Sequence, residues 1–523
     1  MRGEWQELLD EAADSCHGSN HSREFDEEQV RERRRDEAER RIAIREVSRA
    51  RTLLTSSGIA PGSQETLDEL TNVDLRPIEL SQELPTAAME FQPQDQLDLD
   101  PKQLLQALRS AGRGSAPDLA GMRYEHLRVM VDEEQDWALI SELAQDFARA
   151  NVPEEVMQAL RLGRMTALKK DNGKIRGIVA GSIVRRLVCK TVAKQFSDHF
   201  LERTSPFQFA LQTKAGTDAL AHALRLVTDS DPDTVVVSLD GVGAFDHVRR
   251  AAFFEKLMSC EELRELLSLV RALYGSCSRF LWTDDKGKQH VIPQAEGGEQ
   301  GCPLMPALYA LAQHDALMQA SENLLPSERI FSFLDDLYVV TCRARAYEAF
   351  EEVARQVEEH AGVQTHLGKL RAWCSGGGPP PEDLAAECPE AWTADRPDEA
   401  NGLVVLGTPL GTKAFVEAHA RERVQKEQRL LDELPLFKNL QAAWVLLVHS
   451  AAQRANHTIR VVPPSLSNCY AAEHDEAMWT AFCAILGAEE FGSDSAAKSV
   501  STMPARLGGL GLRSATRTAH GAF

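Results

Sequence analysis

Paired cysteines, an apolar leader and long hydrophobic runs are all missing from this sequence. Its ten cysteines in 523 residues show neither the two-residue spacing of a zinc site nor the density of a disulfide scaffold. We therefore expect reduced thiols and an intracellular location, with no preference between nucleus and cytoplasm. No apolar signal core follows Met1, and no apolar run is long enough to cross a bilayer. The sequence thus predicts a soluble protein with no membrane partner.

Positive charge is scarce overall but is concentrated in one segment. The net charge is −21, whereas proteins that bind nucleic acids usually have a basic patch. Residues 161–197, however, hold ten basic residues and one acid, which gives a local charge of +9. This imbalance favours a phosphate-binding surface over an ordinary solvated helix face. Within the segment, Asp171-Asn172-Gly173 predicts a hairpin turn that presents Lys169 on one arm and Arg176 on the other.

Two adjacent carboxylates, Asp335 and Asp336, interrupt an apolar run over residues 331–340. The flanks, Phe-Ser-Phe-Leu and Leu-Tyr-Val-Val, are typical of two short buried strands, so we expect the carboxylates at the tip of a hairpin. Two like charges side by side repel each other, and a hard divalent cation such as Mg²⁺ would offset the repulsion. The alternative interpretation is an ordinary surface turn.

Two further stretches place polar residues where a buried element ends. Residues 234–239 predict a β-branched strand that runs into Asp240, and the glycines at 241 and 243 would let the backbone approach another group closely. As an alternative, Asp240 could cap a helix. Residues 297–306 form a loop rich in glycine and proline before a helix expected over residues 307–319.

The remaining segments predict helices and connectors without evident chemistry. The mixed-charge tract Arg23 to Arg51 is typical of a solvated helix, and residues 58–93 are typical of an irregular connector. We expect no chemistry before residue 100. The other expected elements are a helix over 103–108, a helix start at 116–118, an amphipathic helix over 344–360, a Gly/Pro-rich insertion over 375–381, a strand over 402–407 and a helical module from residue 415.

The order of these motifs resembles the palm of reverse transcriptases, and most of all those of non-LTR retrotransposons. The central matches are Leu239-Asp240 with Ala244-Phe245-Asp246, Gln300-Gly301-Cys302-Pro303-Leu304 with Pro306, and Phe333-Leu334-Asp335-Asp336. Flanking matches are Lys169 with Arg176-Gly177-Ile178, Gln208-Phe209-Ala210-Leu211-Gln212 with Gly216-Thr217, Gly368-Lys369 and Val405-Leu406-Gly407. The ordered combination, over about residues 100–460, is more specific than any single motif.

The resemblance implies an RNA-directed DNA polymerase that uses an RNA template, a DNA primer and deoxynucleoside triphosphates. It implies that Asp240 and Asp335 bridge two Mg²⁺ ions, or Mn²⁺, with Asp336 assisting, in a two-metal mechanism. It implies that Lys169 and Arg176 bind the incoming triphosphate and that Lys369 acts as the general acid. It also implies that Phe245 excludes a 2′-hydroxyl and that Gln300 and Gly301 line the nucleotide and template pocket.

The implied fold class is α+β, a right-hand polymerase with fingers, an antiparallel-sheet palm, a helical thumb and a charged helical N-terminal extension. The expected bounds are 1–100 for the extension, 101–234 for the fingers, 235–412 for the palm and 413–523 for the thumb and C-terminal region. Three residues depart from the family's usual pattern. They are Gly177 for Pro, Met305 for Ser and Leu334 for Ala.

Two other functions stay open at this point. A catalytically decayed palm could serve as a nucleic-acid-binding scaffold, which the acidic net charge and the three departures favour. An RNA-dependent RNA polymerase could use Asp240 and Asp246 as a spaced acidic pair on a ribose hydroxyl, although the sequence from Gln300 to Pro303 argues against it. No endonuclease, ribonuclease H or zinc knuckle is evident, so we expect a fragment of an element or a domesticated domain.

Overall fold

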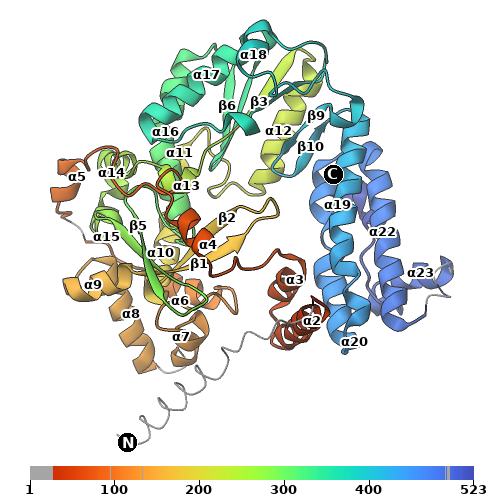
Figure 1. The fold of residues 1–523 in the computed structure, drawn as a ribbon, viewed down its shortest axis with the longest axis horizontal. Helices are drawn as coiled ribbons and strands as arrows, with labels where there is room; N and C mark the ends of the chain where they lie inside the picture. Colours follow the sequence, from red (N-terminus) through yellow and green to blue (C-terminus); the bar gives the residue numbers. More distant parts are fainter. Residues whose placement is uncertain (1–26, 95, 132–133, 489–490, 492–494) are drawn as a thin grey trace, which may run out of the picture.

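The computed structural model describes residues 27–94, 96–131, 134–488, 491 and 495–523. Residues 1–26, which include Cys16 and the start of the mixed-charge tract, lie outside the described residues. The described part has two four-stranded sheets, a two-stranded hairpin and many helices. In Figure 1 the sheet of β1, β2 and β5 lies on one side, the helices α19 and α22 on the other, and the sheet of β3 and β6 above the space between them.

The central sheet is antiparallel throughout and has the order β6-β7-β3-β8. Its strands are β3 (Thr234–Asp240), β6 (Arg329–Phe333), β7 (Asp336–Cys342) and β8 (Arg371–Cys374). Val235, Val236 and Val237 are fully buried, because both faces of a central strand are covered by other elements. The strand expected to end at Asp240 and the hairpin over residues 331–340 are therefore confirmed, and this sheet is the antiparallel palm.

Helices pack on the palm sheet and fix its position. Those that contact its strands are α12 (Gly216–Ser230), α16 (Met305–Asn323) and α17 (Ala346–Gln356). The short α13 (Ala244–His247) follows β3, α14 (Arg250–Ser259) packs on α16, α15 (Leu267–Tyr274) packs on α14, and α18 (Glu382–Glu387) packs on α17. The helices expected over 307–319 and 344–360 correspond to α16 and to α17, which continues into a π-helical turn over Val357–Ala361. The strand expected over 402–407 is β9 (Gly402–Val405), paired with β10 (Thr408–Gly411).

The second sheet combines segments that are far apart in the sequence. Its order is β2-β1-β4-β5, and its strands are β1 (Gly163–Lys169), β2 (Ile175–Gly181), β4 (Ser278–Thr283) and β5 (Gln289–Gln294). It is a mixed sheet, because β1 pairs in parallel with β4. Strands β4 and β5 fall within the range expected for the palm but join the sheet of the fingers segment; the domain bounds stay a prediction.

The helix start expected at residues 116–118 is wrong, because this segment is irregular and leads into a turn at residues 119–120, and α7 begins at Tyr124. Asp118 instead closes the turn by accepting the backbone N–H of Met122 at 2.9 Å. Its other oxygen accepts the N–H of Ile183, the first residue of α10, at 2.9 Å. Asp118 therefore caps a helix distant in sequence. The helices of this region are α6 (Pro101–Arg109), α7 (Tyr124–Met130), α8 (Glu134–Ala148), α9 (Glu154–Arg161), α10 (Ile183–Gln195) and α11 (Ser197–Thr204).

The mixed-charge tract is not one solvated helix, which corrects the expectation. Its described part forms α2 (Glu27–Ala43) and α3 (Val47–Thr55), separated where Arg45 has a left-handed φ of 66°. Ala38 and Ala50 are fully buried against the C-terminal helices. Residues 58–93, expected to be irregular, contain the short helices α4 (Gln64–Leu70) and α5 (Thr86–Glu90).

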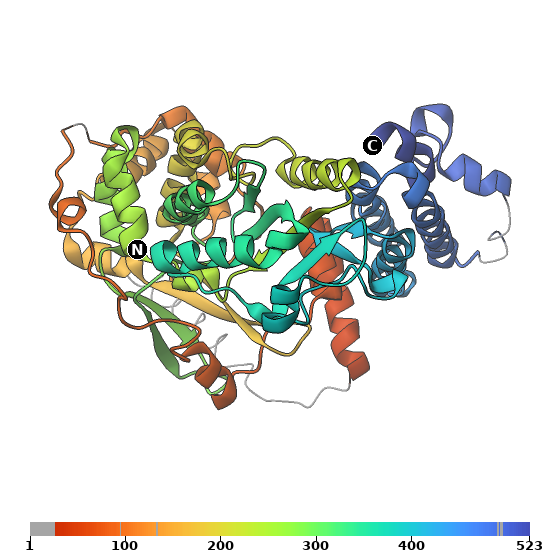
Figure 2. The same cartoon turned by 90° about the horizontal axis from the view of Figure 1, so that it is seen from above.

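The helical C-terminal module is confirmed. It consists of α19 (Lys413–Leu431), α20 (Leu440–Leu446), α21 (Ala455–Val461), α22 (Pro464–Leu486), α23 (Ser495–Ser501) and α24 (Ala515–Ala522). Figure 2 shows these helices grouped at one end of the molecule, with α2 and α3 beside them. This completes the α+β right-hand arrangement of mixed fingers sheet, antiparallel palm and helical thumb.

The structure also bears on the cysteines and on possible membrane-spanning helices. The nine cysteines among the described residues are all free thiols. Of the helices that the structure describes, none has the length and apolar character needed to span a bilayer.

Candidate active site

Asp240 and Asp336 face each other across the palm sheet. They are register partners at the ends of β3 and β7, where these two antiparallel strands pair over seven positions. Asp335 comes directly before β7, in the two-residue turn that joins it to β6. Asp335 and Asp336 are half-buried, as is Asp240. Strand pairing thus brings Asp240 to two adjacent carboxylates that lie almost a hundred residues further along the sequence.

A buried amide holds the turn that carries Asp335. Leu334, the first residue of the turn, has a left-handed φ of 57°, and its N–H donates to Gln208 Oε1 at 2.9 Å. Gln208 Nε2 donates to Ser332 Oγ at 3.1 Å, and the Ser332 hydroxyl donates to Gln313 Oε1 at 3.1 Å. Gln208, Ser332 and Gln313 are all buried. Because a buried amide must be satisfied, this network fixes the turn on the palm.

The three carboxylates disturb one another electrostatically. Burial raises the pKa of Asp336 to about 6, and the charges of Asp335 and Asp240 contribute to the rise. Burial also raises the pKa of Asp335, again with a contribution from Asp240. Positive groups nearby, Arg176 and Lys369, oppose the rise at Asp335. Half-buried like charges of this kind call for a compensating cation.

Lys369 supplies part of that compensation. It lies in the short 3₁₀ helix Leu367–Lys369 before β8, and its Nζ is 2.6 Å from Asp240 Oδ2. The Lys369 side chain is 56% exposed and that of Asp240 is 33% exposed, so the ion pair is open to solvent. Among the described residues, no three carboxylate, histidine or cysteine side chains already converge on one point as a finished metal centre. The donor set nevertheless suits hard cations, since its oxygens are carboxylates whose mutual repulsion a cation would relieve.

The basic hairpin predicted around Asp171-Asn172-Gly173 is confirmed. Strands β1 and β2 pair from Gly163 with Gly181 to Lys169 with Ile175, and Lys169 and Arg176 are exposed on opposite arms. The structure adds Lys170, which the sequence argument counted but did not single out. Burial lowers the pKa of Lys170, as do the charges of Arg176 and Lys369, while Asp240 opposes the change. Lys170 is thus a further exposed cation of the hairpin, within electrostatic reach of Asp240.

Phe245 rests on an aromatic ring from another helix. It lies in α13, after β3, and its ring stacks on that of Tyr309 in α16 at 4.8 Å between centroids and 19° between planes. Tyr309 is fully buried, and burial together with the nearby carboxylates raises the pKa of its phenol. Tyr309 is a further supporting residue that the sequence argument missed; only its position in an otherwise apolar helix could have indicated it.

Gln300 and Asp246 form a second polar pair beside Phe245. Gln300 Nε2 donates to Asp246 Oδ2 at 2.8 Å. Asp246 is buried, burial raises its pKa, and Arg76 lies 3.7 Å away on its other oxygen. Arg76 comes from the segment before residue 100, where we expected no chemistry, and its contact with Asp246 gives this segment a supporting place beside the site. Its guanidinium also donates to Gln294 Oε1 at 2.9 Å and to the Leu70 carbonyl at 2.7 Å.

The structure accounts for Gly301 and for two departures from the family pattern. A Cβ atom on Gly301 would lie 1.9 Å from the Val179 carbonyl oxygen of β2, so glycine permits the loop to touch the fingers sheet. Met305 is buried and its sulfur covers Gly298, where a Cβ would meet it at 2.0 Å. Gly177 packs under Arg76 and Leu70. These substitutions are therefore matched by their neighbours.

A cavity of about 680 Å³ opens beside the carboxylates. Its lining includes Asp240, Asp336 and Lys369, together with residues of β9, of the turn after it and of the start of α19. Arg371 and Arg396 also line it, so the cavity has cations close to its acids.

Carboxylates at the end of an antiparallel palm, with a basic hairpin opposite, define the class of template-directed nucleotidyl transferases. Residues 167–410 match the family described as reverse transcriptase (RNA-dependent DNA polymerase). The chain is 24% identical over 422 residues to the retrotransposable element SLACS 132 kDa protein of Trypanosoma brucei gambiense, which covers 79% of this chain and 33% of that protein. Residues 167–410 are therefore similar to reverse transcriptases, and the chain as a whole resembles those of the non-LTR retrotransposon type. It spans about a third of the length of that curated relative.

Solved structures of telomerase are also similar, at low identity. A Candida albicans telomerase in complex with a fragment of telomeric RNA shares 10% identity and a TM-score of 0.38, over 71% of this chain and 67% of that chain. An apo telomerase from Candida tropicalis shares 10% identity and a TM-score of 0.39, over 64% of this chain and 59% of that chain.

Proposed function

We propose that this chain adds deoxynucleotides to the 3′ end of a DNA primer on an RNA template. The observation that supports this best is the pairing of Asp240 with Asp336 in β3 and β7, with Asp335 in the adjacent turn. Burial and the neighbouring carboxylates raise the pKa values of Asp335 and Asp336, so keeping these groups charged is costly without a cation. Asp240, Asp335 and Asp336 would hold two Mg²⁺ ions, or Mn²⁺, which when bound stabilise charge on the attacking and leaving oxygens.

The basic hairpin supports the choice of a triphosphate substrate. Lys169, Arg176 and the added Lys170 would bind the incoming phosphates, because exposed cations opposite a carboxylate cluster attract a polyanion to it. Lys369 would protonate the departing pyrophosphate, for which its Nζ must first leave Asp240 Oδ2, 2.6 Å away. Both roles are carried over from the family because these residues occupy the matching motif positions.

Phe245 and the loop of Gln300 and Gly301 would shape the nucleotide site. The stack of Phe245 on Tyr309 gives it a firm support from which to exclude a ribose 2′-hydroxyl. Gln300 would line the pocket from a side chain that also holds Asp246. In the alternative function, an RNA-dependent RNA polymerase, Asp246 would bind a ribose hydroxyl. The Asp246 carboxylate is buried and accepts a hydrogen bond from Gln300, which argues against that role.

Primer extension tests the proposal directly. The assay uses a DNA primer on an RNA template with deoxynucleotides and Mg²⁺ or Mn²⁺, and compares the parent with Asp335→Asn. Asp315→Asn serves as a matched control, because Asp315 is exposed on α16 and pairs only with Lys256 among the described residues. We expect extension by the parent and the control and none by Asp335→Asn, with nucleic-acid binding retained by all three.

Absence of extension by the folded parent would contradict the proposal. If the parent still bound the template, the chain would act as a nucleic-acid-binding scaffold. Leu334→Ala and Met305→Ser, which restore the residues usual in the family, would then be the first variants to assay for a return of extension.

A further inference from the structure

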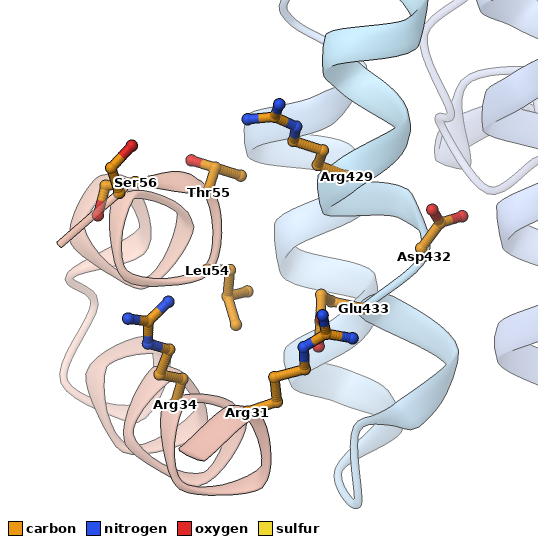
Figure 3. Close-up of a pocket in the computed structure, with 9 residues that line it drawn as sticks. Arg31, Arg34, Leu54, Thr55, Ser56, Arg429, Asp432 and Glu433 are labelled. Atoms are coloured by element: carbon orange, nitrogen blue, oxygen red, sulfur yellow. The ribbon is translucent and has the colours of Figure 1, made fainter. Parts of the chain in front are cut away.

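A second cavity, of about 420 Å³, lies away from the carboxylates, between the N-terminal helices and the thumb. Figure 3 shows Arg31 and Arg34 on α2, Thr55 and Ser56 at the end of α3, and Arg429 on α19 around this space. The walls come from segments almost four hundred residues apart. We name this cavity the arginine cleft. Neither the proposed reaction nor the family motifs involve its residues.

The arginines of the cleft are not used to hold the fold together. Arg31, Arg34 and Arg429 make no ion pair with any residue that the structure describes, although acids are plentiful in a chain of net charge −21. The neighbouring Arg35, by contrast, is buried and bridges Glu28 and Glu433 at 2.6 and 3.0 Å. The ion pairs that join α2 to the thumb are thus made by Arg35 and not by the three arginines of the cleft.

The acids that line the cleft are already engaged. Glu433 accepts from Arg35 at 3.0 Å, and Asp432 accepts from Gln428 Nε2 at 2.7 Å. With Glu433 neutralised, three guanidinium groups face a single carboxylate. Guanidinium groups bind phosphate through parallel hydrogen bonds, and the hydroxyls of Thr55 and Ser56 add further polar partners. The cleft therefore has the chemistry of an anion site.

Hydrogen bonds join the edge of the cleft to the basic hairpin of the fingers. Ser57, also in its lining, donates to Asp171 Oδ1 in the β1–β2 turn at 2.6 Å. The Lys169 N–H donates to the Gly58 carbonyl at 3.1 Å, and Ala60 N–H donates to the Ala167 carbonyl at 2.9 Å. A strand held by Lys169 and Arg176 could therefore pass from the hairpin directly onto the cleft.

We infer that the arginine cleft binds backbone phosphates of a single nucleic-acid strand outside the catalytic cavity. The choice of a nucleic acid over another phosphate compound rests on the proposed function. It is also supported by the lining, since no aromatic side chain among the described residues lines the cleft to stack on the base of a free nucleotide. A strand crossing the cleft needs only backbone contacts.

The test measures binding without nucleotides, so it does not depend on catalysis. Fluorescence anisotropy gives the affinity for an RNA and a DNA oligonucleotide of the same sequence at several salt concentrations. The test variant combines Arg31→Gln, Arg34→Gln and Arg429→Gln. The control variant combines Arg40→Gln, Arg355→Gln and Arg421→Gln, which removes the same charge from exposed arginines that are paired with Glu37, Glu359 and Glu399.

We expect the test variant to bind RNA about tenfold more weakly than the control variant, with a salt slope smaller by about 0.7 for each phosphate that the arginines no longer neutralise. Thermal melting should show both variants folded, because none of the three cleft arginines forms an ion pair with a described residue. If the test variant loses affinity for RNA but not for DNA, the Thr55 and Ser56 hydroxyls take part in recognising the ribose. If it loses affinity for both equally, the cleft recognises the backbone phosphates alone. Both outcomes support the inference. Equal binding by the test and control variants would overturn it, even if primer extension succeeded.

Discussion

Lys369 Nζ lies 2.6 Å from Asp240 Oδ2, so an ammonium group rests on the carboxylate that faces Asp336 across the palm sheet. The ion pair is exposed to solvent, and it partly offsets the repulsion among the three carboxylates. The same ammonium must compete with any cation that these carboxylates bind. A metal ion that binds Asp240 would therefore release the Lys369 ammonium, the candidate general acid, from its ion pair.

Replacing Lys369 should separate these two effects. In Lys369→Gln we expect Mg²⁺ to raise the melting temperature at lower concentrations than in the parent, because Asp240 is no longer paired. We also expect the extension rate at saturating Mg²⁺ to fall by about 10²-fold, the usual contribution of a general acid. Melting curves and single-turnover extension measure the two. Lys438→Gln, far along the thumb and paired with Glu32 and Asp36, is the control. An unchanged rate would exclude the role in proton transfer.

Phe245→Ala should admit ribonucleotides. Removal of the ring opens the space beside Tyr309, so the ratio of ribonucleotide to deoxynucleotide incorporation should rise by at least about tenfold, given that one steric clash is worth roughly 1–3 kcal/mol. Tyr309→Ala removes only the support of the ring and should give a smaller rise. Competition between the two nucleotides in primer extension measures both. Unchanged discrimination in Phe245→Ala would disprove the assigned role.

Gln208→Leu should loosen the turn that carries Asp335. The N–H of Leu334 would lose its acceptor in a buried setting, which costs about 1–3 kcal/mol of unfolding free energy. The extension rate should fall more than the affinity for nucleotide, because Gln208 is buried and acts on Asp335 through the backbone of Leu334. Gln313→Leu disrupts the same network one bond further away and is the matched comparison. If both variants lost stability equally and neither lost rate, the network would be purely structural.

His314 predicts a pH dependence of stability. It is 9% exposed on α16, and burial, with the charge of Lys256, lowers its pKa to about 4. The unfolded chain, with a pKa of about 6.5, takes up the proton more readily, so the stabilisation is complete above pH 6.5 and is lost as the pH falls toward 4. By pH 5 the loss is about 2 kcal/mol. Urea unfolding at pH 7.5 and 5 should show that His314→Gln lacks this loss, whereas His360→Gln on the surface keeps it.

Local patterns in the sequence were sufficient to locate the palm. Strand β3 and the hairpin of β6 and β7 are apolar, β-branched and bounded by polar residues, so their positions follow from short-range preferences. The same holds for the hairpin of β1 and β2, because Asp171-Asn172-Gly173 is a turn sequence. The order of these motifs also carries the resemblance to reverse transcriptases.

Local patterns misled where distant segments decide the outcome. Asp118 has the side chain of a helix cap, yet the helix that it caps, α10, lies sixty-five residues further on. The tract that begins α2 is charged enough to be solvated, but Ala38 and Ala50 turn its helices onto the thumb. No pattern in the sequence around Arg76 indicates its role, because that role depends on Asp246, whose carboxylate lies 3.7 Å away.

The sequence by itself determined which residues are chemically capable, namely the three carboxylates, the basic hairpin and the aromatic Phe245, because composition and spacing are local properties. Only the tertiary structure decided which of them meet. Strand register sets Asp240 against Asp336, a buried amide holds the turn at Asp335, and the N-terminal helices bring Arg31 and Arg34 opposite Arg429. Such meetings arise from burying apolar faces that are distant in the chain, and no periodicity of a short segment records them.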